Sequence, residues 1–130
     1  MATSPDFKRI SLVCVPTADQ DRAVAFYEQL GFEKRTDESF GGGSRWIEVY
    51  LPGTPTGLAL TPPPPGQDIM PMVTGITLTT EDIARTHAAL KALGVDVDAD
   101  VMRMGGSVPP LFWFRDPSGH TLMVVERHEA

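Results

Sequence analysis

Residues 17–31 read TADQDRAVAFYEQLG, and residues 80–94 read TEDIARTHAALKALG. An offset of 63 residues aligns the two stretches, and it also aligns Gly42-Gly43-Ser44 with Gly105-Gly106-Ser107. A repeat of this length that occurs only twice is not a solenoid, because stacked arrays use shorter units in at least three copies. We therefore expect a duplicated αβ module whose two copies bury apolar surface together.

The repeated stretches carry the signals of two helices. Apolar side chains recur at helical spacing in each copy, which predicts helices over residues 19–30 and 81–93. Thr17 or Asp19 can supply the oxygen that caps the first helix. Gly31 is suited to the left-handed conformation that ends a helix.

Short apolar or alternating runs around the helices predict strands. They cover residues 10–15, 32–35, 45–51 and 57–61 in the first copy and 76–80, 95–101, 111–115 and 122–126 in the second. Each module, over residues 6–61 and 72–128, is therefore βαβββ. The proline-rich segment 62–71 between them favours an extended linker. The fold class is α+β within a single domain over residues 1–130, with two curved mixed sheets.

Composition limits the class of protein. The chain has 130 residues, of which 42% are hydrophobic and 22% charged, as in soluble globular domains. No apolar run is long enough to span a membrane, and the N-terminus lacks the apolar core of a signal peptide, so we expect a cytoplasmic protein. The single Cys14 agrees with a reducing compartment. A net charge of −6 argues against nucleic acid or an anionic membrane as partner.

Four segments resemble the vicinal oxygen chelate superfamily, which includes glyoxalase I, extradiol dioxygenases, and bleomycin- and fosfomycin-resistance proteins. They read DQDRAVAFY over 19–27, LGF over 30–32, LKALGV over 90–95 and FWFRDPSGH over 112–120. The resemblance covers nearly the whole chain. It implies the fold and a cavity formed by the curved sheets, but little about the reaction, because such folds host many chemistries.

In metal-using members of this superfamily, the ligands come from the first and last strand of each module. The resemblance, checked with the 63-residue offset, assigns these positions to Leu12, Leu60, Gly75 and Met123. Divalent ions need imidazole, carboxylate or water oxygen, which leucine and glycine cannot supply, and a thioether is a poor ligand. We therefore expect no metal site and no cofactor.

The three histidines do not suggest a replacement site. His87 falls in the second helix, His120 in a turn and His128 in the C-terminal tail. We expect each to be structural or exposed, and not to share an ion.

The same resemblance implies that the ligand positions face the cavity, and strand alternation then selects their neighbours. The expected lining is Leu12, Cys14, Trp46, Glu48, Tyr50, Leu60, Leu111, Trp113 and Met123. An aromatic, apolar lining with one carboxylate suits an organic molecule that carries a flat ring or a cation. The aromatic residues could instead pack at a module or subunit interface.

Glu48 and Cys14 are the weak catalytic candidates. Glu48 could accept a ligand amine or act as a general base, or it could be solvated or paired with Arg45 or Arg103. Cys14 could be a reactive thiol, but no cation is placed beside it, so a small buried apolar residue is expected.

Three functions remain open at this point. The first is a metal-independent homodimer that binds and sequesters a small aromatic or cationic compound, as bleomycin-type resistance proteins do. The second is a lyase, isomerase or dioxygenase of the same superfamily with a non-standard active site. The third is a protein whose concave face binds another protein.

Overall fold

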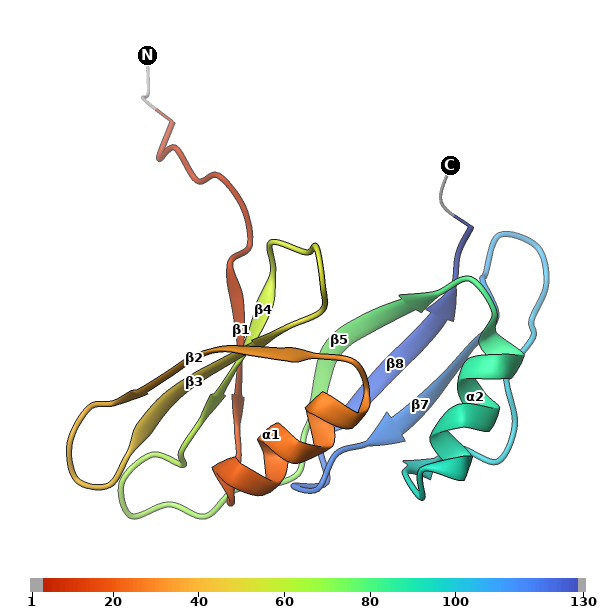
Figure 1. Cartoon of the computed structure of the whole chain (residues 1–130). Coiled ribbons are helices and arrows are strands. Elements are labelled where there is room, and N and C mark those ends of the chain that lie inside the picture. Colours follow the sequence, from red (N-terminus) through yellow and green to blue (C-terminus); the bar gives the residue numbers. More distant parts are fainter. Residues whose placement is uncertain (1–3, 129–130) are drawn as a thin grey trace. The chain divides into compact units, whose positions relative to one another are not determined.

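Each copy of the repeat folds into one helix and one four-stranded sheet (Figure 1). The structure is a computed structural model that describes residues 4–128. The chain divides into two compact units between Pro65 and Gly66. The expected α+β class with two mixed sheets is confirmed.

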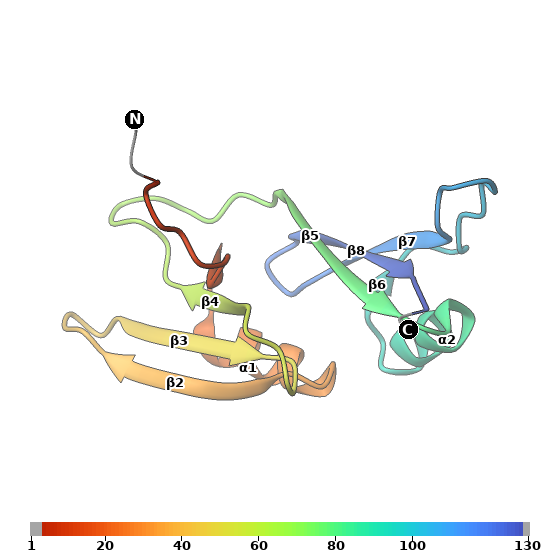
Figure 2. The same ribbon diagram turned by 90° about the horizontal axis from the view of Figure 1, so that it is seen from above.

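The first unit contains β1 (Leu12–Pro16), α1 (Gln20–Gln29), β2 (Glu33–Ser39), β3 (Arg45–Tyr50) and β4 (Gly57–Thr61). The strand order is β1-β4-β3-β2, with β1 parallel to β4 and the other neighbours antiparallel. β2 and β3 run side by side as a long hairpin (Figure 2).

The second unit repeats this plan with β5 (Val73–Thr80), α2 (Ile83–Ala92), β6 (Asp96–Val97), β7 (Leu111–Arg115) and β8 (Thr121–Glu126). Its strand order is β5-β8-β7-β6, and β5 is parallel to β8. The two sheets therefore have the same connectivity, as a duplication requires.

The helix ends follow from side chains in the sequence. The Asp19 carboxylate accepts a hydrogen bond from the backbone N–H of Arg22 at 3.1 Å, and Asp82 accepts one from Arg85 at 3.0 Å. These bonds satisfy amides that the first helical turn leaves unpaired. Gly31 follows α1 with φ +100°, a conformation that favours glycine. The two predicted helices are confirmed, with ends shifted by one or two residues.

The core of the first unit lies on one face of its sheet. Val15, Ile47 and Leu60 are register partners, and all three are fully buried. α1 packs against β3 and β4, and it contributes Ala23 and Tyr27 to the buried apolar side chains.

The second unit is built in the same way. Phe112 and Phe114 on β7 are buried opposite their partners Val124 and Leu122 on β8. His87 of α2 packs edge-on against Phe112, with ring centroids 4.9 Å apart. The opposite face of each sheet carries no helix of its own unit.

The strand predicted over residues 95–101 is wrong in its length, since β6 covers only Asp96–Val97. Asp98 explains the early end. One carboxylate oxygen of Asp98 accepts the backbone N–H of Trp113 at 3.2 Å, and the other binds Arg115 at 2.7 Å. The backbone N–H of Asp98 still donates to the Trp113 carbonyl at 3.0 Å, but the return bond of a continuing strand is made to the side chain and not to the Asp98 carbonyl.

None of the helices within residues 4–128 combines the length and the apolar character that crossing a membrane would require.

Candidate functional site

The helix-free face of the first sheet carries most of the predicted site residues. Cys14, Ala59 and Glu48 are successive register partners across β1, β4 and β3. Trp46 and Tyr50 lie two residues to either side of Glu48, so their side chains leave β3 on the same face. On β1, Leu12 is two residues before Cys14, so these two side chains also share one face.

Glu48 is held by its two aromatic neighbours. The indole Nε1–H of Trp46 donates to Oε2 of Glu48 at 2.7 Å, and the hydroxyl of Tyr50 donates to Oε1 at 2.7 Å. The bond to the carboxylate is the main cause that raises the pKa of Tyr50 above its usual value. Each carboxylate oxygen therefore has a neutral donor, and neither Arg45 nor Arg103 pairs with Glu48 within residues 4–128.

Tyr50 is contacted from both strands that flank β3. On β2, the guanidinium carbon of Arg35 lies 4.6 Å from the centroid of the Tyr50 ring. On β4, a Cβ added to Gly57 would lie 2.6 Å from two carbons of that ring. The Tyr50 ring therefore packs directly against the backbone of Gly57. We refer below to Trp46, Glu48, Tyr50, Arg35 and Gly57 together as the Glu48 cluster.

The sequence did not single out Arg35 or Gly57. Arg35 sits at a register shift between Lys34 and Thr36, where β2 has one residue more than β3. This β-bulge interrupts the alternation from which a strand residue is assigned to a face. Gly57 has no side chain, and its contact with the Tyr50 ring can be recognised only in the structure.

The placement of Leu60 in the cavity is wrong. Leu60 is fully buried and is in register with Val15 and Ile47 on the helix-covered face, so Ala59 holds the helix-free position. The error lies in the 63-residue offset. Cys14 and Thr77 are 63 residues apart, but their partners Ala59 and Met123 are 64 apart. These two offsets differ by an odd number of residues. Because side chains alternate between the faces of a strand, the 63-residue offset assigns Leu60 to the wrong face.

The expectation that Cys14 is a small buried residue is also wrong. Its thiol is free and the residue is exposed. β1 is an edge strand of its sheet, and the neighbour of Cys14 on the helix-free face is the short side chain of Ala59. The edge position and this short neighbour account for the exposure of the thiol.

The helix-free face of the second sheet carries two apolar pairs, with Thr77 and Thr79 of β5 beside them. Trp113 is paired with Met123 and Leu111 with Val125, and Leu111 and Val125 are buried. Met123 joins Trp113 to Thr77 as Ala59 joins Glu48 to Cys14, so Trp113 has the place in the second sheet that Glu48 has in the first, and no carboxylate lies there.

The metal-ligand positions implied by the resemblance do not fit a divalent ion. Leu12, Gly75 and Met123 offer no oxygen or nitrogen side-chain ligand, and neither does Ala59, which replaces Leu60 at the fourth position. Within residues 4–128 no three His, Cys, Asp or Glu side chains are grouped so that they could hold a metal ion.

The histidines lie on separate elements. His87 is within 2.7 Å of the carbonyl oxygen of Asp98, and the buried His120 accepts the backbone N–H of Met72 through Nδ1 at 3.2 Å. His128 is exposed and lies 3.8 Å from Glu126. Each imidazole ring therefore has a different interaction partner.

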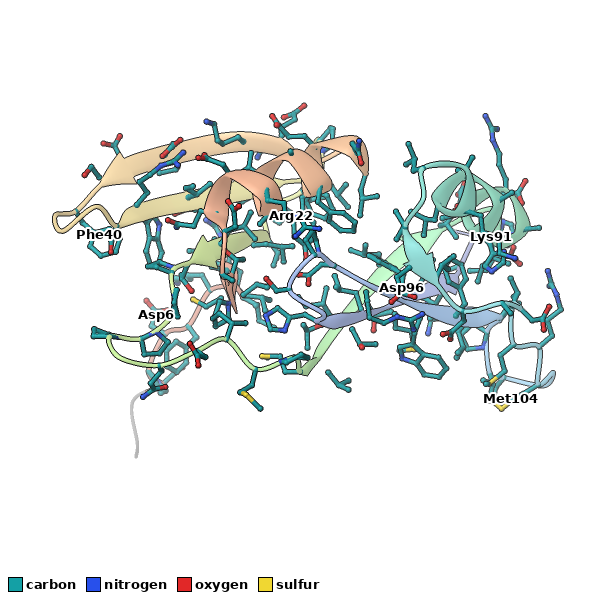
Figure 3. All side chains as sticks on the ribbon, turned by 90° about the horizontal axis from the view of Figure 1, so that it is seen from below. Asp6, Arg22, Phe40, Lys91, Asp96 and Met104 are labelled. Atoms are coloured by element: carbon teal, nitrogen blue, oxygen red, sulfur yellow. The ribbon has the colours of Figure 1, made fainter. Side chains whose placement is uncertain are left out.

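Arg45 contributes to the fold beside the site. It binds both carboxylate oxygens of Asp37 at 3.0 and 2.7 Å, and it binds Asp21 of α1 at 2.6 Å. The bond to Arg45 holds the pKa of Asp37 well below its usual range. Figure 3 shows Phe40 at the turn of the β2–β3 hairpin, one residue beyond β2.

Comparisons with known proteins agree with this fold. The profile of the Glyoxalase/Bleomycin resistance protein/Dioxygenase superfamily matches residues 9–124. The uncharacterised protein YetH of Bacillus subtilis strain 168 is 30% identical over 122 residues, which cover 92% of this chain and 98% of YetH.

Two crystal structures extend the comparison. TnmS3, an antibiotic-binding protein from Streptomyces sp. CB03234, is 28% identical with a TM-score of 0.78 over 95% of this chain and 98% of its own. A superfamily member from Sphaerobacter thermophilus DSM 20745 is 30% identical with a TM-score of 0.80 over 93% and 98%.

Proposed function

Since the chain belongs to the Glyoxalase/Bleomycin resistance protein/Dioxygenase superfamily, we propose that it is a metal-independent protein that binds a small organic molecule. The molecule carries a flat ring or a cationic group, and binding sequesters it. The observation that carries the proposal is the set of side chains on the helix-free face of β3, where two aromatic residues hold one carboxylate. The antibiotic-binding TnmS3 supports it as a relative of similar length.

The chemistry of this face suits binding more than turnover. Trp46 and Tyr50 offer ring faces that attract flat molecules and cations. Each Glu48 oxygen accepts one hydrogen bond from a neutral neighbour, which holds the carboxylate in place as an acceptor for a ligand. The ligand positions Leu12, Gly75, Met123 and Ala59 leave metal-assisted chemistry without side-chain ligands.

We further propose a cytoplasmic homodimer that binds neither nucleic acid nor membranes. Large apolar side chains are exposed before β1 and before β5, including Phe7 at 92% and Met70 at 75%. Exposed apolar surface of this kind often marks a subunit contact. The net charge of −6 disfavours polyanionic partners. Sedimentation equilibrium tests the dimer, and a monomer at micromolar concentration would contradict it.

A thermal-shift screen tests the binding function. The purified protein is heated with flat aromatic antibiotics, cationic glycopeptides and simple aromatic amines, and ligands that bind the native state raise the melting temperature. Hits are repeated with Trp46→Ala, and we expect at least a tenfold loss of affinity because a buried aromatic contact is removed. If no compound shifts the melting temperature, the proposal is wrong.

A further inference from the structure

Glu48 differs from Asp37, the other half-buried carboxylate of the first sheet, in its charge balance. Asp37 is paired with Arg45 and Lys34. Within the described part of the first unit, no Lys, Arg or His nitrogen lies within 4.0 Å of the Glu48 oxygens. Its two partners, Trp46 and Tyr50, are neutral donors, so the negative charge has hydrogen bonds but no counter-ion.

The charges of Arg9 and Arg35 both act to lower the pKa of Tyr50, but neither arginine makes an ion pair with Glu48 within the described first unit. Arg35 lies across the Tyr50 ring, and its Nη2 binds Glu33 at 3.3 Å. Glu33 is the register partner of Tyr50, so the Arg35–Glu33 pair is close to neutral beside the ring. Within the Glu48 cluster, Glu48 is therefore the charged group without an ion-pair partner.

The carboxylate is also fixed in direction. Trp46 and Tyr50 bind one oxygen each, which leaves the remaining lone pairs of Glu48 in set directions. Tyr50 can take this position because Gly57 leaves room beneath its ring, and any Cβ at position 57 would overlap the ring at 2.6 Å. An acceptor that is fixed before binding loses little conformational freedom when the ligand arrives.

We infer that Glu48 binds the ammonium group of an aromatic amine, with Gly57 and Tyr50 as the residues that position the carboxylate. The inference rests on the proposed binding function and narrows it to organic cations. An ammonium group supplies the missing positive charge and donates to the free lone pairs of the carboxylate, while the ring of the amine lies against Trp46 or Tyr50. The second unit has Trp113 at the equivalent place in its sheet, so one ammonium group is bound per chain.

The test uses two probes that share one ring and differ in charge. 1-Naphthylmethylamine is protonated at pH 7, and 1-naphthalenemethanol is its neutral counterpart. Titrations followed by calorimetry at low salt should show the amine binding about tenfold more tightly, as expected for a charge-assisted hydrogen bond. This ratio should fall towards one in Glu48→Gln.

Glu38→Gln is the matched control, because exposed Glu38 is on the same face opposite Trp46 and lacks the two aromatic donors. It should keep the wild-type ratio. Equal binding of both probes by the wild type, or an unchanged ratio in Glu48→Gln, overturns the inference and leaves the binding function standing. A wild-type protein that binds neither probe contradicts both.

Gly57→Ala tests the positioning role without changing any side chain that would touch the amine. It should displace the Tyr50 ring, reduce the amine-to-alcohol ratio several-fold and shift the indole N–H resonance of Trp46 in NMR spectra. Gly57 has no positive φ, so the strand itself tolerates alanine. Should Gly57→Ala not fold, Tyr50→Phe keeps the ring and removes the donor to Glu48. An unchanged ratio in the variant that folds rejects the positioning role.

Discussion

Thr17 and Thr80 occupy the same place in the two copies of the repeat, but their hydroxyl groups are in different situations. The Thr80 hydroxyl lies 2.7 Å from that of Thr86, whereas the Thr17 hydroxyl is buried without a hydrogen-bond partner among the described residues. The residue equivalent to Thr86 in the first copy is Ala23. The Thr80 hydroxyl also accepts the backbone N–H of Asp82 at 3.2 Å, and the Thr17 hydroxyl makes no such bond to the equivalent Asp19.

Replacing each threonine by valine should have opposite effects on stability. Thr17→Val removes a buried unpaired hydroxyl and should raise the free energy of unfolding by up to about 1 kcal/mol. Thr80→Val removes the hydrogen bonds of this hydroxyl with Thr86 and with the backbone N–H of Asp82, and it should lower the free energy of unfolding by about 1 kcal/mol. Urea denaturation measures both variants, and a destabilised Thr17→Val would show that this hydroxyl is hydrogen-bonded in solution.

At the residue level, the sequence predicted which face of a strand a side chain occupies better than it predicted which residues that side chain contacts. Alternation along β3 was sufficient to place Trp46, Glu48 and Tyr50 on one face. It could not predict that Glu48 is held by these two neighbours, because that depends on side-chain rotamers. Arg35 was missed because a β-bulge breaks the alternation that would have revealed it.

At the level of the elements, the helices depend on equivalent caps. Asp19→Ala and Asp82→Ala should each lower the free energy of unfolding by about 1 kcal/mol, since each removes the acceptor for an N-terminal amide. Asp19→Asn is the control and should cost much less, because asparagine caps helices as well as aspartate does. Chemical denaturation gives the values, and a loss in only one helix would show that the caps are not equivalent.

The Asp37–Arg45 pair joins β2 to β3 and makes stability depend on pH. The pKa of Asp37 is lowered from 3.8 in the folded state, chiefly by the hydrogen bond to Arg45. The pair therefore stabilises the fold above about pH 4, and this stabilisation is lost as the pH falls further. Asp37→Asn should show a small decrease in melting temperature at pH 7 that shrinks below pH 4. A decrease that is independent of pH would mean that packing, and not charge, is lost.

Prediction of the elements was accurate where the signals are local. Asp19 and Gly31 mark the ends of α1 within the sequence itself. β6 was predicted too long because its end is set by Asp98, which binds Trp113 on another strand. Leu60 was misplaced because the connections before β4 and β8 differ, and sequence repeats do not preserve register across such a change.

For the whole molecule, the main prediction concerns metals. Since the ligand positions hold Leu12, Ala59, Gly75 and Met123, treatment with EDTA should change neither the melting temperature nor the affinity for 1-naphthylmethylamine. Protein purified without chelator should contain far less than one equivalent of nickel, zinc, iron or manganese by elemental analysis. A stoichiometric metal would require ligands from other residues.

The exposure of Cys14 has a practical consequence for experiments on the whole chain. It is the only cysteine, so a maleimide dye or spin label would attach at one defined position without further mutation. That position is two strands from Glu48 on the same face, with only Ala59 between them. A fluorophore at Cys14 would therefore make the natural protein its own sensor for compounds that arrive at this face.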